Sequence, residues 1–184
     1  MSICKRDDER MRKWLILAGI VVLTVMIDQV AKWWVMANML LYESREVLPI
    51  VHPYIQFTRT TNTGIAFGLG AGGSTFFLSL SVLIVAGLLW FYRTTPDETT
   101  AHYVALSLVI GGALGNIIDR ARFGHVVDFF HVTVPGLISN VSNFADHFIV
   151  LGVIVLLVDG FINPQHATED DDTADTASSS SPLD

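Results

Sequence analysis

The chain has 184 residues, of which 51% are hydrophobic and 16% are charged, and its mean hydropathy is +0.49. Four long apolar runs in a chain of this length exclude an ordinary soluble domain and indicate a small polytopic membrane protein. The single cysteine, Cys4, excludes an internal disulfide and a cysteine-based zinc site. The net charge of −7 does not indicate a charged binding face, because six of these negative charges lie in a C-terminal tail without Lys or Arg: Glu169, Asp170, Asp171, Asp172, Asp175 and Asp184.

A basic segment, residues 1–13, precedes the first apolar run at residues 14–36. This run is long enough to cross about 30 Å of hydrocarbon at about 1.5 Å per residue. The positive-inside rule therefore predicts that the N-terminus is cytoplasmic. Asp28 and Lys32 lie four residues apart in this run and share one face of the expected helix. They suit either an internal ion pair or a polar site.

The region from 38 to 73 is predicted to be an external loop, because charged residues and two prolines interrupt its apolar character. Within it, residues 55–58 alternate in the manner of a short strand rich in β-branched and aromatic side chains. Asn62 and Gly64 then provide turn chemistry.

Three further apolar runs complete the expected spans, which are residues 14–36, 74–92, 101–118 and 143–162. Gly111 and Gly115 in the third span favour close helix packing. The second external connection, 121–142, contains an apolar stretch around Asp128 that we expect to lie on the membrane surface. The acidic tail, 163–184, is predicted to be disordered and cytoplasmic.

This topology brings most of the polar residues of the spans and loops to the outer leaflet, and no comparable set forms at the inner leaflet. Ionisable side chains at membrane depth are costly, so they indicate a functional site. Individual members also have simpler interpretations: Asp119 and Arg120 suit the membrane interface, and Asp146 suits the positive end of a helix dipole. The set comprises Asp28, Lys32, Asn62, Asn116, Asp119, Arg120, Asp128, Asn143 and Asp146.

Two carboxyl groups held together in a low-dielectric setting do not both ionise, so one stays protonated and the other charged. Such a pair suits peptide hydrolysis, in which the charged member activates a water and the protonated member polarises the carbonyl. The residues alone leave open whether Asp119 or Asp128 belongs to this pair.

Other chemistries receive less support from the pattern. A zinc site could use His125, Asp128, His131, Asp146 and His147, but the His-Glu-x-x-His motif is absent. A proton-coupled transporter would explain the charged residues, although four spans without repeats offer a short translocation path. Ser107 has neither a nucleophile elbow nor an evident histidine partner.

Five blocks of polar, small and apolar residues follow one another in the chain: Asp28-Gln29-Val30-Ala31-Lys32, Asn62-Thr63-Gly64-Ile65-Ala66-Phe67, Gly111 to Arg120, Gly124 to Phe129, and Asn143-Phe144-Ala145-Asp146. In this order they resemble the motifs of the lipoprotein signal peptidase family, the bacterial signal peptidase II enzymes, over residues 14–162. A departure is Ser142, where relatives often carry an aromatic residue, and the acidic tail also lies outside the shared pattern.

The resemblance implies an aspartic endopeptidase of the bacterial inner membrane that is sensitive to globomycin. Its substrates would be diacylglyceryl-modified prolipoproteins, cleaved on the N-terminal side of the lipidated cysteine. The family's catalytic pair falls on Asp128 and Asp146. The positions that line or support the site fall on Asp28, Lys32, Asn62, Gly64, Asn116, Asp119, Arg120 and Asn143.

The resemblance also implies a fold class: an all-α membrane protein with four transmembrane helices, a small extracytoplasmic β-cradle and a surface-lying external segment. Residues 14–162 would form the four-helix intramembrane peptidase domain. We expect a monomer in contact with membrane lipids, with no cofactor, no metal and no nucleic-acid partner. Both termini would be cytoplasmic and the active site would lie near the outer leaflet.

Overall fold

The computed structural model describes residues 2–47, 50, 54–64, 73–94 and 99–163, and for residues 2–10 it describes the backbone alone. Its helices are α1 (Ser2–Asn38), α2 (Gly73–Thr94), α3 (Thr100–Phe123) and α4 (Phe144–Ile162). Its strands are β1 (Ser44–Glu46), β2 (Ile55–Asn62), β3 (Val126–Val134) and β4 (Ile138–Ser142). Residues 164–184 of the predicted tail and residues 65–72 of the first loop lie outside the described residues.

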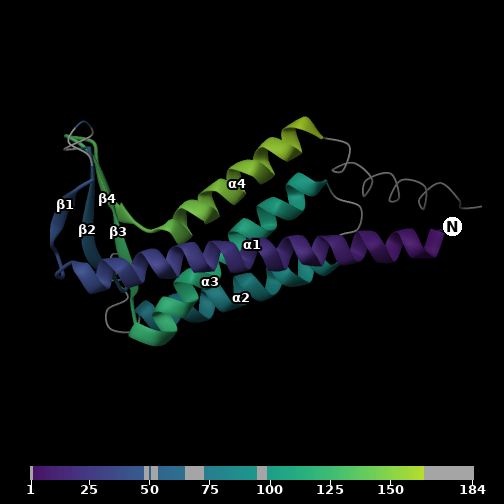
Figure 1. Ribbon diagram of the computed structural model, residues 1–184, viewed down its shortest axis with the longest axis horizontal. Helices are drawn as coiled ribbons and strands as arrows, with labels where there is room; N and C mark the ends of the chain where they lie inside the picture. The colour runs from purple at the N-terminus through teal and green to yellow at the C-terminus, as the bar shows by residue number, and fades with distance from the viewer. Residues whose placement is uncertain (1, 48–49, 51–53, 65–72, 95–98, 164–184) are drawn as a thin grey trace, which may run out of the picture.

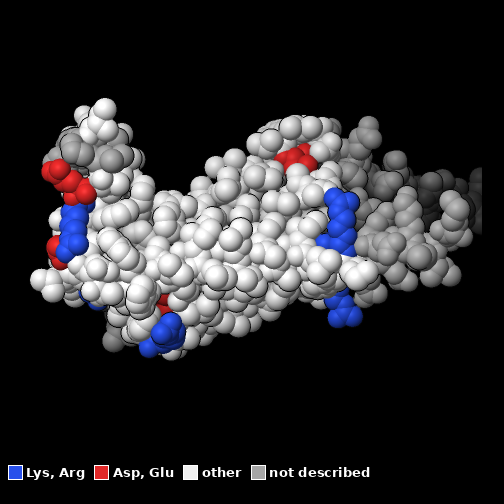
Figure 2. Space-filling view, viewed as in Figure 1, with Lys and Arg blue, Asp and Glu red and all other residues white. Residues whose placement is uncertain are grey.

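Each helix contains a segment long and apolar enough to cross a membrane, which confirms the four predicted spans. These segments are Met11–Asn38, Gly73–Thr94, Thr100–Phe123 and Phe144–Ile162. The sheet lies at one end of the helices, and the start of α1 and the end of α4 lie at the other (Figure 1). On the face seen in Figure 2, charged side chains gather toward the two ends and the stretch between them is uncharged.

The strands form one antiparallel sheet in the order β1-β2-β3-β4. The strand predicted at 55–58 is confirmed and continues to Asn62, with a register shift between Phe57 and Thr60. Beyond this shift, Thr60 lies opposite Asp128. The sheet thus joins the two long connections of the chain into one unit.

The apolar stretch around Asp128, expected to lie on the membrane surface, forms part of β3, in which residues 126–129 are buried. Strand β3 pairs with β2 along this apolar run and with β4 from Phe130 onward, so the run is part of the sheet. The all-α description therefore omitted a second β-forming connection.

Two helix boundaries also differ from the prediction. Helix α1 begins at Ser2, so residues 2–13 of the basic segment are helical and continuous with the first span. Helix α3 continues to Phe123 and ends where Gly124, at φ 73°, donates its N–H to the carbonyl of Arg120. Asp119 and Arg120 therefore lie within the helix, and Asp119 is fully buried in the protein.

Helix α3 is the central helix and packs against α1, α2 and α4. Its glycines permit this close approach, as the small-residue pattern predicts. A Cβ atom on Gly115 would lie 2.7 Å from Asp28 Oδ2 of α1 and 3.2 Å from Ala145 Cβ of α4. Gly112 lies equally tightly against Ala145 and Ile149. The three helices thus converge at the end that carries the sheet.

Candidate active site

A buried ion cluster ties α1 to α3 beneath the sheet. Lys32 Nζ lies 2.8 Å from Asp28 Oδ2 and 2.8 Å from Asp119 Oδ2. All three side chains are at most 1% exposed. The ion pair expected between Asp28 and Lys32 is therefore present, and Asp119 joins it from a second helix.

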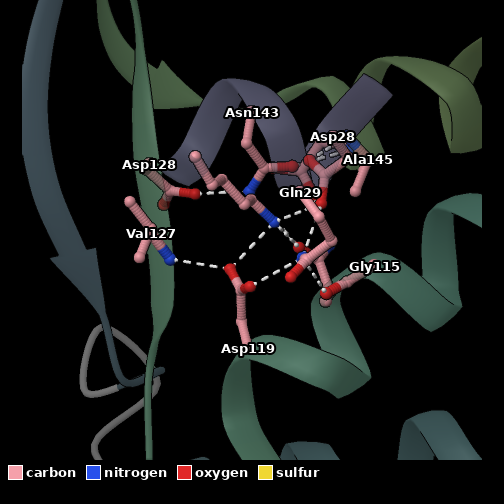
Figure 3. Close-up of polar contacts among 11 residues, drawn as sticks. Asp28, Gln29, Gly115, Asp119, Val127, Asp128, Asn143 and Ala145 are labelled. Atoms are coloured by element: carbon pink, nitrogen blue, oxygen red, sulfur yellow. Dashed lines mark hydrogen bonds and ion pairs between the residues drawn. The ribbon is translucent and has the colours of Figure 1, made fainter. Parts of the chain in front are cut away.

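Both carboxylates also accept backbone hydrogen bonds from other elements. Asp28 Oδ1 accepts the N–H of Ala145 at 2.9 Å, and Asp119 Oδ2 accepts the N–H of Val127 at 3.0 Å. The cluster thus reaches the first turn of α4 and the start of β3 (Figure 3).

Gln29 is a member of this cluster that the sequence analysis did not select. Its Nε2 donates to Asp119 Oδ1 at 2.9 Å, to Asp28 Oδ2 at 3.2 Å and to the carbonyl of Gly115 at 3.3 Å. An amide in an apolar span beside an aspartate was the available signal. Its contact with Asp119 depends on how α1 packs on α3, which the sequence does not specify.

Two asparagines connect Asp128 to Asp146. Asn143 Nδ2 donates to Asp128 Oδ1 at 2.6 Å and lies 3.3 Å from Asn116 Oδ1. Asn116 Nδ2 in turn donates to Asp146 Oδ1 at 2.7 Å. Lys32 Nζ donates to Asn116 Oδ1 at 3.2 Å, so the asparagines also touch the ion cluster. The chain brings both aspartates to one polar site from β3 and α4.

The two aspartates differ in their surroundings. Asp128 is 3% exposed on β3, whereas Asp146 is half-buried in the first turn of α4. Burial, and next the charge of Asp146, raise the pKa of Asp128 to about 6, while hydrogen bonds from Asn143 and Asn62 oppose this rise. Asn143 caps α4, since its Oδ1 accepts the N–H of Asp146 at 3.0 Å. Asp146 thus lies at the positive end of the helix dipole.

Asn62, Gly64 and Arg120 border the site from the side of α2. The N–H of Gly64 donates to Asn62 Oδ1 at 3.0 Å, and the positive φ of 81° at Gly64 explains the glycine in this turn. Gly64 also packs directly on the ring of Phe77. The guanidinium of Arg120 lies 5.8 Å from the centre of that ring, and its buried Nε has no hydrogen-bond partner among the described residues.

Among the described residues, no group of His, Cys, Asp or Glu side chains is arranged to hold a metal ion, and two of the histidines considered for zinc have other contacts. His131 Nδ1 contacts Gln56 and Thr58, each at 3.0 Å, and its Nε2 contacts Ser139 at 2.9 Å. Both ring nitrogens are therefore engaged by side chains of the sheet. His147 Nε2 lies 3.2 Å from the hydroxyl of Ser142.

The fold and this site define a class of protein: a polytopic membrane protein with a pair of carboxyl groups held between a sheet and the ends of its helices. The family model described as Signal peptidase (SPase) II matches residues 20–162. The chain belongs to this family, whose members are peptidases.

Relatives and solved structures agree with this assignment. A lipoprotein signal peptidase of Bartonella tribocorum is 37% identical over 139 residues, which cover 74% of this chain and 81% of the relative. That of Moorella thermoacetica is 39% identical over 134 residues, covering 73% and 85%. A bacterial membrane enzyme solved by the in meso method has a TM-score of 0.71 at 32% identity, covering 83% of this chain and 92% of that one.

Proposed function

We propose that this protein is an aspartic endopeptidase that removes signal peptides from diacylglyceryl-modified prolipoproteins. Cleavage would occur on the N-terminal side of the lipidated cysteine. The observation that carries the proposal is the Asn143 and Asn116 bridge, which links the carboxyl groups of Asp128 and Asp146 through hydrogen bonds of 2.6, 3.3 and 2.7 Å.

The different surroundings of the two aspartates suggest their roles. Asp128 retains a proton more readily, because burial and the neighbouring carboxylate raise its pKa to about 6. Asp146 lies at the N-terminus of α4, where the helix dipole stabilises a negative charge. The charged Asp146 therefore takes a proton from a water while the protonated Asp128 donates a hydrogen bond to the scissile carbonyl.

In this reaction the water oxygen bonds to the carbonyl carbon and forms a tetrahedral intermediate. The carbon–nitrogen bond then breaks, and the proton taken by Asp146 passes to the leaving nitrogen of the lipidated cysteine. The signal peptide departs as a carboxylic acid. The pair formed by Asp128 and Asp146, the dyad, then regains its single shared proton. Asn116 and Asn143 hold the two carboxyl groups in place throughout.

The supporting residues have separate tasks in this proposal. Asn62 donates to Asp128, and Gly64 allows the turn that carries Asn62. Arg120 places a positive charge beside the dyad. Asp28, Lys32 and Asp119 form the buried layer beneath it.

The membrane orientation follows from the same proposal. The basic residues in the first part of α1 favour a cytoplasmic N-terminus. The sheet and the two aspartates, which lie at the opposite end of the helices, would then be near the outer leaflet of the bacterial inner membrane. We propose a monomer that contacts membrane lipids directly and is inhibited by globomycin.

A precursor peptide tests the activity directly. The protein in phospholipid nanodiscs is incubated with a precursor carrying diacylglyceryl on its cysteine, and with the same peptide unmodified. We expect mass spectrometry to detect a product that begins at the lipidated cysteine, and no product from the unmodified peptide. Equal cleavage of both peptides, or cleavage at another bond, would contradict the proposed specificity.

A further inference from the structure

The residue directly before each proposed catalytic aspartate gives its backbone N–H to a buried carboxylate. Val127, which precedes Asp128, donates to Asp119 at 3.0 Å. Ala145, which precedes Asp146, donates to Asp28 at 2.9 Å. The two sides of the dyad are thus anchored in the same way (Figure 3).

These two anchors share one cation. Lys32 Nζ lies 2.8 Å from each of the two anchoring carboxylates, which come from α1 and α3. Gln29 joins the same pair a second time, with hydrogen bonds of 2.9 Å to Asp119 and 3.2 Å to Asp28. A continuous set of buried polar contacts therefore runs from the backbone before Asp128 to the backbone before Asp146.

We propose that Asp28, Lys32 and Asp119, braced by Gln29, form a positioning device that sets the separation of the two catalytic carboxyl groups. The inference rests on the proposed function, since it takes Asp128 and Asp146 as the reacting pair. Those aspartates belong to β3 and α4, which are separate elements. Lys32 of α1 contacts the anchors of both aspartates and so fixes their positions relative to each other. A misplacement of about 1 Å at such a site costs about 100-fold in rate.

If these charges only stabilised the fold, their variants should match the kcat and pH profile of a variant that removes another buried charge. The chain contains such a matched control. Asp159 is a buried carboxylate that ties α4 to α3 at the end away from the sheet. It accepts hydrogen bonds from Thr99, the cap of α3, at 2.7 Å and from Asn163 at 3.0 Å. Asp159→Asn removes a buried charge between α3 and α4 without touching Asp128 or Asp146.

The kinetic test compares Asp28→Asn, Asp119→Asn and Gln29→Met with Asp159→Asn in folded, inserted protein. We expect the first three to lower kcat by about 10- to 100-fold with KM within about twofold. They should also move a limb of the pH–rate profile, because the mutual charge effect of Asp128 and Asp146 depends on their separation. Asp159→Asn should leave kcat and both limbs in place.

A second measurement does not depend on activity. Hydrogen exchange in Lys32→Met should become at least about tenfold faster at the amides of both Val127 and Ala145, because both anchors lose their shared partner. If Lys32→Met does not fold, the milder Gln29→Met should show the same paired effect.

Two results would overturn the inference: exchange that changes at neither amide or at only one, or anchor variants whose kcat and pH profile match those of Asp159→Asn. A wild-type protein that cleaves no lipidated precursor would instead contradict the proposed function. The paired exchange result would still stand in that case, so the two failures are distinguishable.

Discussion

At the end of the helices that carries the sheet, Asp28, Lys32 and Asp119 are almost completely buried and contact one another. The opposite end is closed mainly by apolar packing around Tyr92, a residue with no exposed surface. There, Leu17, Val85, Leu106 and Ile110 form a conventional hydrophobic cluster between α1, α2 and α3. Helices α1 and α3 are therefore joined by ions at one end and mainly by apolar contacts at the other, where the buried carboxylate of Asp159 lies between α3 and α4.

Apolar packing like that around Tyr92 can hold these helices together without buried ions. Replacing a buried ion pair by well-packed hydrophobic residues is often neutral or stabilising, whereas removing one partner is costly. An apolar closure like that around Tyr92 would serve packing alone. The ions at the sheet end are therefore best explained by the aspartates that they anchor.

The largest effect on stability is expected for Lys32→Met. It leaves the carboxylates of Asp28 and Asp119 without their shared cation, at a cost of about 3–5 kcal/mol. Thermal unfolding in detergent micelles measures this loss. Lys13→Met is the control at the other end, where Lys13 lies over the rings of Tyr92 and Tyr103, and it should cost about 1 kcal/mol or less. Equal losses would remove the contrast between the two ends.

The next largest expected effect is a gain in stability, for Asp128→Asn. The pKa of Asp128 is raised to about 6 from an ordinary value of 3.8, so the folded state binds its proton more tightly than the unfolded state does. The resulting contribution to stability is lost as the pH rises from about 4 through 6. Asp128→Asn should therefore stabilise the protein by up to about 3 kcal/mol at pH 7.5, and by roughly half of that at pH 5. A gain that does not depend on pH would contradict this explanation.

Gly115→Ala tests the convergence of the three helices at the charged end. The new Cβ would lie 2.7 Å from Asp28 Oδ2, so α1 or α3 must shift, at a cost of about 1–3 kcal/mol. Gly87 of α2 has open space around it, and Gly87→Ala should be neutral or stabilising by up to about 1 kcal/mol. Thermal unfolding of the two variants, measured together, decides whether the close approach matters.

The smallest effect is expected for Asp159→Asn. The amide keeps an oxygen that can accept from Thr99 Oγ1, so the loss should be about 1 kcal/mol, with peptidase activity unchanged. A large loss of activity without unfolding would show that the end away from the sheet also influences the site.

Local patterns in the sequence were sufficient to predict the four apolar helices and to select the set of polar residues. Hydropathy is a property of consecutive residues, so the four apolar helices could be predicted without knowing what they contact. The intramembrane charges at Asp28 and Lys32 were conspicuous for the same reason.

Strand β3 could not be predicted in this way. Its residues Val126, Val127, Phe129 and Phe130 surround Asp128 without polar alternation, because residues 126–129 are all buried and both faces of the strand are therefore covered there. Its partner β2 is far away in the sequence, and a strand of this kind resembles any short apolar run. The pattern therefore suggested a segment on the membrane surface.

The residue pattern also could not decide whether Asp119 or Asp128 belongs to the carboxyl pair. Both are buried carboxylates near the same end of α3, but Asp119 pairs with Lys32 while Asp128 faces Asn143. Only the packing of α1 against α3 makes that distinction. The same packing recruits Gln29, which the pattern did not select.

The most direct measurement of the central claim is the kcat/KM of Asp128→Asn and Asp146→Asn on a lipidated precursor, compared with Asp119→Asn and Asp159→Asn at equal amounts of folded protein. We expect the kcat/KM of Asp128→Asn and of Asp146→Asn to fall by about 10³-fold or more. The loss of kcat/KM should be smaller for Asp119→Asn and absent for Asp159→Asn. Full activity in either Asp128→Asn or Asp146→Asn would contradict the assignment of the dyad.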